Sequence, residues 1–160
     1  MKIKILTTGG TIDKIYFDQK SQFEVGDPQI EQLLSEANIT FDFEVRQLMR
    51  KDSLEITEAD RQLIKQAVAA EQADKILITH GTDTMVETAR SLGNISDKTV
   101  VFVGSMQPAR LRVSDAFFNV GYAVAALQLL PAGVYVAMNG RIFDPLKTHK
   151  NVALNRFEPD

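Results

Sequence analysis

The chain has 160 residues, of which 44% are hydrophobic and 24% charged, and these values are typical of one globular domain with a core of its own. The formal net charge is −3, so no basic surface is expected and nucleic acid is excluded as a partner. The chain has no cysteine and only two histidines, His80 and His149. This excludes disulfides and thiolate chemistry and argues against a zinc site.

No segment has the pattern of a signal peptide or a membrane span. Residues 1–6 carry charge inside an apolar run, and the longest apolar stretch, residues 120–130, is too short to cross a bilayer. We therefore expect a cytoplasmic protein without membrane contact.

The first quarter of the chain predicts a strand, a long loop, a helix and a second strand. A β-branched run at residues 3–7 precedes two glycines and predicts a buried strand. The polar residues 13–27 predict a loop long enough to be functional. A helix is expected to begin at Pro28, and the alternating residues 41–48 predict the second strand.

A capping box marks the start of the next helix. Thr57 is the predicted N-cap, Asp60 is its partner three residues later, and the helix is expected to continue to about Glu71. The remaining pattern predicts strands at 75–79, 99–103 and 133–138, helices at 85–92 and 115–130, and a mixed, less regular tail at 141–160.

Short apolar strands therefore alternate with helices along the chain. This alternation predicts a three-layer α/β/α fold with a mostly parallel open sheet, Rossmann- or flavodoxin-like, formed by residues 1–160 as one domain. In such sheets a ligand lies just beyond the carboxyl ends of the strands.

Three of these strand ends combine glycines with hydroxyl and polar side chains: residues 8–11 (TGGT), 79–84 (THGTDT) and 104–108 (GSMQP). Glycines let a ligand approach the backbone, and a threonine hydroxyl is a nucleophile once a base activates it. Asp83 is one candidate base. A lysine amine held neutral by its surroundings, from Lys150 or Lys147, is another. Neither a P-loop nor a dinucleotide-binding fingerprint is present.

Each of these residues also has a purely structural interpretation. Residues 9–11 alone predict a strand-to-helix turn with Thr11 as the cap. His80 alone predicts a hydrogen-bonding residue at a strand end, and Asp83 alone predicts a cap for the following helix. The other structural interpretations are a helix cap (Asp115), core aromatic residues (Phe117, Phe118, Tyr122) and first-turn helix charge (residues 55–60).

Taken together, residues 7–12 (TTGGTI), 78–85 (ITHGTDTM) and 101–108 (VFVGSMQP) resemble the bacterial L-asparaginase and glutaminase-asparaginase family in order and spacing. The resemblance continues through Asp115 and residues 136–139, covers nearly the whole chain, and is to the N-terminal domain of that family.

The resemblance implies an amidohydrolase that splits asparagine, or a related small amide, into a carboxylate and ammonia without metal or cofactor. Thr11 matches the nucleophile of the family. Thr82, Asp83 and Lys150 match its second threonine with a supporting acid and lysine, and Lys147 is the alternative lysine.

The resemblance also implies a set of substrate-binding residues. Ser53 matches the serine that binds the substrate α-carboxylate, and Asp83 offers a negative group to the substrate ammonium. Gly10, Gly81 and Ser105 are expected to shape the pocket, with backbone donors near the amide oxygen.

Three features depart from the family pattern. Phe23 stands where the family has an activating tyrosine in a mobile loop, and Tyr16 is the nearby substitute. Leu54 stands where some members have a substrate-contacting glutamine. The C-terminal domain, which in the family closes the active site of a neighbouring subunit, has no counterpart in these 160 residues.

Three functions are therefore open. The first is an asparaginase-like amidohydrolase, and the second is a non-catalytic module that binds aspartate or asparagine. The third is one subunit of a larger amidohydrolase or amidotransferase. Under each of them we expect a homodimer or higher homo-oligomer, because family members self-associate and the exposed apolar helix surface needs a cover.

Overall fold

The computed structural model describes residues 1–160 and is built on one six-stranded sheet. The first five strands in the sheet are parallel and the sixth is antiparallel at the edge. In spatial order they are β4 (Asp42–Lys51), β1 (Lys2–Gly9), β5 (Lys75–Thr79), β6 (Thr99–Val103), β7 (Gly133–Met138) and β8 (Arg141–Phe143).

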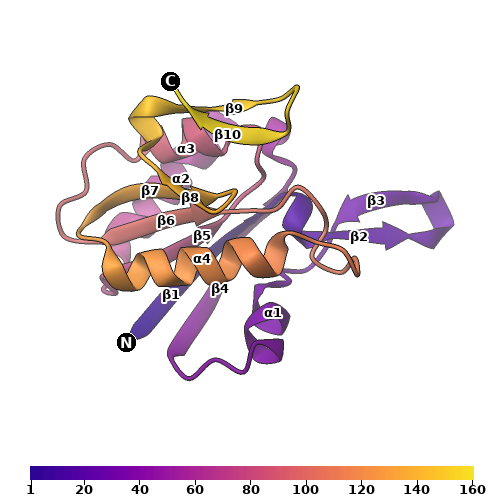
Figure 1. Ribbon diagram of the computed structural model, residues 1–160, viewed down its shortest axis with the longest axis horizontal. Helices are drawn as coiled ribbons and strands as arrows, with labels where there is room; N and C mark the ends of the chain where they lie inside the picture. The colour runs from indigo at the N-terminus through magenta and orange to yellow at the C-terminus, as the bar shows by residue number, and fades with distance from the viewer.

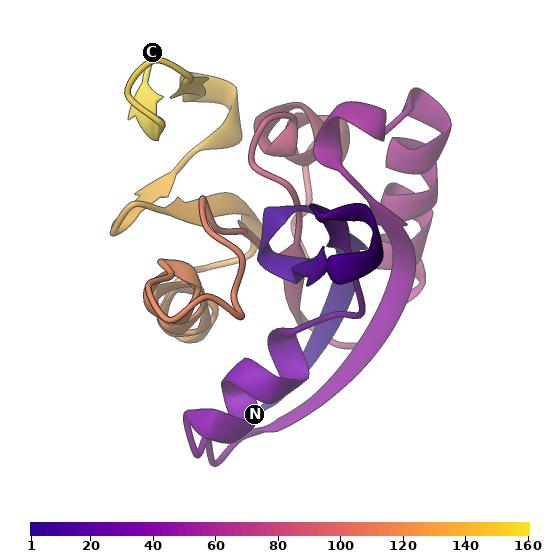
Figure 2. The same cartoon turned by 90° about the vertical axis from the view of Figure 1, so that its right-hand side faces the viewer.

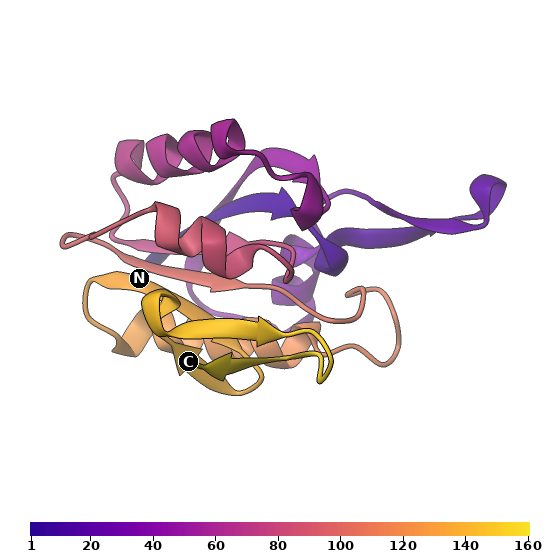
Figure 3. The same cartoon turned by 90° about the horizontal axis from the view of Figure 1, so that it is seen from above.

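Helices cover both faces of this sheet, which confirms the predicted three-layer α/β/α fold. They are α1 (Ile30–Glu36), α2 (Glu58–Ala70), α3 (Met85–Ser91) and α4 (Ala116–Leu129). α2 and α3 lie on one face, and α1 and α4 lie on the other (Figures 1 and 3). The first parallel strand of the chain lies second in the sheet, which is the flavodoxin-like order.

One crossover connection has the opposite hand to the others. The connections through α2 and α3 run toward β7 over one face, whereas the connection through α4 runs the same way over the opposite face (Figure 2). The connection through α1 runs toward β4 over the α4 face and so shares the hand of α2 and α3. Because nearly all such crossovers are right-handed, the α4 connection is the exception.

Local sequence accounts for the regular elements. β5 and β6 are short and almost wholly buried, as their continuous apolar sequences predict. The predicted capping box is confirmed at α2, where the Thr57 side chain accepts from the Asp60 N–H and the Asp60 carboxylate accepts from the Thr57 N–H. None of the helices combines the length and apolar composition that crossing a bilayer requires.

The predicted loop at 13–27 is wrong, because this segment contains an antiparallel hairpin. Its strands are β2 (Lys14–Phe17) and β3 (Gln22–Val25), and it projects from the body of the molecule (Figures 1 and 3). Tyr16 and Phe23 lie directly opposite each other in the register, with ring centroids 5.5 Å apart. The aromatic cross-strand pair stabilises a hairpin that the surrounding polar residues had obscured.

The tail is more regular than predicted. It contains β8 and a second hairpin of β9 (Thr148–Asn151) and β10 (Arg156–Pro159). Arg90 on α3 donates to the carbonyl oxygens of Pro145 and Thr148, which holds the tail against the body. These bonds join segments more than 50 residues apart and so leave no local signal in the sequence.

Two further expectations need correction. α1 begins at Ile30 rather than Pro28, because the backbone N–H of Gln29 donates to a buried carboxylate. Phe117 and Phe118 are not core residues, since their exposed fractions are 45% and 61%. The sheet side of α4 is occupied by smaller residues. Phe117 lines a pocket beside Leu33 of α1, and Phe118 stacks on the half-buried Tyr122 at 6.1 Å.

Candidate active site

The candidate site lies where the strand order reverses, beyond the carboxyl ends of β1 and β5. Glycine backbones bring the loops there into direct contact. A Cβ atom on Gly10 would lie 2.4 Å from the N and Cα atoms of Gly81, and one on Gly81 would lie 2.6 Å from the Cβ of Ser53. Only residues without side chains fit at these two positions, so Gly10 and Gly81 are required to bring the three loops together.

The turn after β1 is fixed by backbone bonds. Gly10 has a φ of 89°, and its N–H donates to the Lys51 carbonyl oxygen at 2.9 Å. Just before it, the Thr8 hydroxyl donates to the Thr79 carbonyl oxygen at 2.9 Å, which ties β1 to β5. The position of the next residue, Thr11, therefore follows from contacts with both neighbouring strands.

Thr11 is the first residue of a short 3-10 helix, residues Thr11–Asp13. It is half-buried, and its hydroxyl makes no hydrogen bond to another residue of the chain. The interpretation of Thr11 as a helix cap is wrong, because Gly10 occupies the cap position and no side chain caps this helix. The Thr11 hydroxyl is thus left for a ligand.

Ser53 begins a second 3-10 helix, residues Ser53–Glu55, whose capping box is formed by Asp52. The Ser53 side chain lies against Gly81, and its carbonyl oxygen accepts a bond from the Thr84 hydroxyl at 2.7 Å. This bond ties the loop after β4 to the loop after β5. Sequence reasoning did not single out Thr84, and no local pattern signals a bond between residues 31 positions apart.

Lys150 from β9 meets the loop after β5. Its Nζ donates to Thr82 Oγ1 at 2.8 Å and to Asp83 Oδ1 at 2.6 Å. The Lys150 side chain is only 11% exposed, whereas that of Asp83 is 41% exposed. The geometry brings Lys150 to this pair rather than Lys147, which lies in a short 3-10 helix at Pro145–Lys147. Asp83 contributes no capping bond to α3, so its interpretation as a helix cap is wrong.

His80 has the structural role that its sequence position predicts. Its ring is fully buried, and Nδ1 donates to the Gly81 carbonyl oxygen at 2.7 Å. The pKa of His80 is lowered to about 4, chiefly by burial; the bond to Gly81 opposes this shift and the positive charge of Arg61 adds to it. His80 is therefore neutral and shapes the backbone beside Thr82.

The third strand end forms the wall of the site next to Thr82. The Ser105 side chain is buried, and its hydroxyl donates to the Gln107 carbonyl oxygen within the same loop. The Asp115 carboxylate accepts from the backbone N–H groups of Met106 and Gln107 at 2.9 and 3.0 Å. Asp115 precedes α4 but does not cap it with its side chain, so the carboxylate shapes this loop instead.

Two of the three family departures, Phe23 and Leu54, lie in exposed positions beside the site. Tyr16 and Phe23 are about half exposed on the projecting hairpin, and Leu54 is 74% exposed. Lys14 at the base of the hairpin pairs with Asp52 at 3.0 Å, which joins the hairpin to the Ser53 loop. Partial burial raises the pKa of Asp52, but the Leu54 N–H and Lys14 outweigh it and hold that pKa below its usual value.

The arrangement combines three hydroxyl groups with a lysine–carboxylate pair around a glycine-lined backbone. Of the predicted site residues, the structure joins Gly10, Gly81 and Ser53 in one group of contacts and Thr82, Asp83 and Lys150 in another. No group of three or more His, Asp or Glu side chains that could hold a metal ion is present. The chemistry available to these residues is nucleophilic attack by a hydroxyl, assisted by proton transfer and backbone donors.

Comparison with known proteins finds one family and several relatives. The family model "Asparaginase, N-terminal" matches residues 2–157. One subunit of the glutamyl-tRNA(Gln) amidotransferase from Thermoplasma acidophilum is 33% identical over 129 residues, which cover 77% of this chain and 32% of the relative.

Two solved structures are similar over almost the whole chain. The thermostable L-asparaginase from Thermococcus kodakarensis superposes with a TM-score of 0.84 at 31% identity, over 99% of this chain and 51% of the relative. A probable cytoplasmic L-asparaginase from Campylobacter jejuni gives a TM-score of 0.76 at 34% identity, over the same shares of both chains. The chain thus spans about half the length of these relatives or less.

Proposed function

The chain belongs to the asparaginase family, and from that premise we propose that it hydrolyses the side-chain amide of L-asparagine, or of a related small amide, with Thr11 as the nucleophile. The observation that carries the proposal is the contact of Lys150 with both Thr82 and Asp83. It supplies a route for protons beside a second hydroxyl, which a binding site for a small zwitterion does not need.

The proposed reaction has two steps. The Thr11 oxygen forms a bond to the amide carbon, the C–N bond breaks, and the nitrogen leaves with a proton as ammonia. Water then cleaves the resulting ester, which restores the Thr11 hydroxyl and releases the carboxylate product. Thr82 and Lys150 move the protons, and backbone N–H groups near Gly10 and Gly81 stabilise the negative oxygen of each tetrahedral intermediate.

Substrate binding is proposed to use opposite charges and a hydroxyl. The Ser53 hydroxyl binds the α-carboxylate. Asp83 uses Oδ1 for Lys150, which leaves Oδ2 for the substrate ammonium. Gly81 and Ser105 shape the space between these groups.

The test is an ammonia-release assay over asparagine, glutamine and small amides. Thr11→Ala is expected to reduce turnover to the background rate, and Lys150→Met is expected to reduce it by about 100-fold or more, as for the loss of a general acid or base. The matched controls are Thr40→Ala, at an exposed threonine away from the site, and Lys147→Met. Full ammonia release by a folded Thr11→Ala chain contradicts the proposal.

A second candidate function is one subunit of a larger amidotransferase. The Thermoplasma acidophilum relative is named as such a subunit, and this chain spans only part of its relatives. Under this alternative the chain alone releases no ammonia, and activity appears only with a co-purifying second polypeptide.

The non-catalytic alternative is favoured by Phe23, which lacks the hydroxyl of a tyrosine. A thermal melt distinguishes it from hydrolysis. Stabilisation by aspartate without ammonia release from any amide supports a binding module.

We also propose that residues 1–160 form one asparaginase N-terminal-type domain that self-associates in the cytoplasm. The exposed aromatic residues of α4 support self-association. The Campylobacter jejuni relative, named a probable cytoplasmic enzyme, supports the location.

A further inference from the structure

Asp13 is a buried acid that the proposed reaction does not use. It lies two residues after Thr11 and ends the same 3-10 helix, yet only 1% of it is exposed. Burying a carboxyl group is costly unless hydrogen bonds compensate for the lost water. The partners of Asp13 therefore indicate what the group does.

Asp13 joins three segments. Its carboxylate Oδ1 accepts from the backbone N–H of Gln29 at 2.9 Å, at the start of α1. Its carbonyl oxygen accepts from the Gly26 N–H at 2.8 Å, where the projecting hairpin ends, and its own N–H donates to the Gly10 carbonyl oxygen at 3.1 Å. The turn that holds Thr11, the end of the hairpin and the start of α1 thus meet at one residue.

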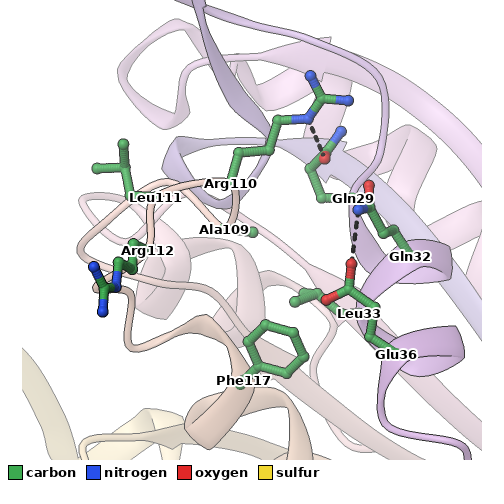
Figure 4. Close-up of a pocket in the computed structure, with 9 residues that line it drawn as sticks. All are labelled: Gln29, Gln32, Leu33, Glu36, Ala109, Arg110, Leu111, Arg112 and Phe117. Carbon is green, nitrogen blue, oxygen red and sulfur yellow. Dashed lines mark hydrogen bonds between the residues drawn. The ribbon is translucent and has the colours of Figure 1, made fainter.

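The connection continues to the loop after β6. Gln29 is buried, its Oε1 accepts from Arg110 Nε at 2.9 Å, and its Nε2 donates to the Asp27 carbonyl oxygen at 2.7 Å. In Figure 4 the Arg110 and Gln29 side chains point toward each other at the edge of a pocket of about 440 Å³. The Ala109 N–H also donates to the Ile12 carbonyl oxygen at 3.1 Å. The Thr11 turn is therefore held from both sides.

The charge state of Asp13 changes within the neutral pH range. The pKa of Asp13 is raised to about 7, chiefly by burial; the Gln29 N–H and Arg50 lower it and Asp27 raises it, but burial dominates. The folded junction is therefore more stable with the carboxyl group protonated, and ionisation weakens it. The charged groups on the elements packed around it are Lys14, Asp27, Arg50 and Arg110.

We propose that Asp13 is a positioning residue for Thr11: its buried carboxyl group locks the Thr11 turn and the hairpin to the start of α1, and ionisation of that group loosens the lock. The catalytic part of this inference rests on the proposed function. Arg50 and Asp27 pair with each other, and Lys14 and Arg110 contact Asp52 and Gln29, so the Gln29 N–H is the direct partner of the carboxylate.

The kinetic test compares the wild-type chain with Asp13→Asn between pH 5.5 and 8.5. Asparagine keeps the acceptor oxygen but carries no charge. The wild-type kcat is expected to fall by about fivefold as the pH rises through 7, because ionisation of the buried carboxyl group loosens the Thr11 turn. The Asp13→Asn kcat is expected to stay at the low-pH value, with KM little changed in both. Asp18→Asn, at an exposed position of the same hairpin, is the control and should retain the fall.

A second measurement needs no activity. In amide hydrogen exchange, corrected for the intrinsic effect of pH, protection of the Gln29 and Gly26 N–H groups should decrease as the pH rises through 7 in the wild-type chain and not in Asp13→Asn. Unchanged protection of these amides in the wild-type chain overturns the inference, as does a fall in kcat through pH 7 that persists in Asp13→Asn. If the chain releases no ammonia but protection of the Gln29 and Gly26 amides still changes with pH, the proposed function is contradicted. The structural role of Asp13 is then still supported.

Discussion

Single residues decide whether the loops of the candidate site can meet. Gly10 combines a φ of 89° with a backbone contact to Gly81 that leaves no space for a methyl group. A side chain at position 10 would strain the backbone and push the first strand end away from the loop that carries Thr82. The close approach of these two loops therefore depends on the absence of a side chain at position 10.

Gly10→Ala is expected to destabilise the fold by about 2 kcal/mol or more, because alanine disfavours a positive φ and its Cβ would overlap Gly81. The measurement is a urea titration. Gly121→Ala is the matched control, since no atom lies within 4 Å of a Cβ at that helical position. The control should stabilise the chain by about 0.5–1 kcal/mol, and equal effects of the two substitutions would contradict the argument.

Among the elements, the 3-10 helices and the β9–β10 hairpin position the side chains of the candidate site more directly than the long helices do. Thr11 and Ser53 each begin a 3-10 helix, and Lys150 lies on a short edge hairpin. The positions of such short elements are determined by a few hydrogen bonds to distant segments. The long helices, by contrast, form because of their own sequence and pack through the apolar face that each one buries.

Thr57→Ala tests whether local sequence stabilises α2. Removing the cap is expected to lower the free energy of unfolding by about 1 kcal/mol, because the Asp60 N–H loses its acceptor at the helix start. The change is measured by urea denaturation. Ammonia release by the folded chain should not change, and Thr40→Ala should have no measurable effect on stability.

Considered as a whole, the molecule combines a well-buried sheet with one acidic group whose burial is unfavourable. The pKa of Asp13 is about 7 in the folded chain and near 3.8 in the unfolded chain. Between these values the folded state binds more protons, so stability falls as pH rises from about 4 to about 7. The positioning role of Asp13 thus carries a cost in stability at neutral pH.

The expected loss over that pH range is on the order of 4 kcal/mol, since one pKa unit corresponds to about 1.4 kcal/mol. Asp13→Asn should remove it, so that the variant matches the wild-type chain near pH 4 and is more stable at pH 8. Thermal melts across this range check the prediction. Equal pH dependence in the two chains would show that Asp13 does not titrate as described.

Self-association is the second property of the whole molecule. α4 carries two exposed aromatic residues, Phe117 beside α1 and Phe118 stacked on Tyr122, and exposed apolar surface of this kind marks interaction surfaces. Light scattering at micromolar concentration is expected to give at least a dimer, and Phe118→Glu is expected to shift it toward the monomer. A wild-type chain that scatters as a monomer contradicts the proposal.

The sequence by itself determined the features that depend on neighbouring residues. The alternation of apolar strands and helices predicted the three-layer fold, and the spacing of Thr57 and Asp60 predicted the start of α2. The three glycine-containing strand ends were recognisable because parallel strands deliver their carboxyl ends to one edge of the sheet.

Only the tertiary structure decided the features that depend on distant residues. It selected Lys150 over Lys147 through a bond to Thr82 across 68 positions, and it gave the α4 crossover its unusual hand. It also showed that Asp115 and Asp13 bind backbone N–H groups of other segments. The physical reason is that local sequence fixes propensity and period, whereas the partners of a buried polar group are chosen by the packing of the entire chain.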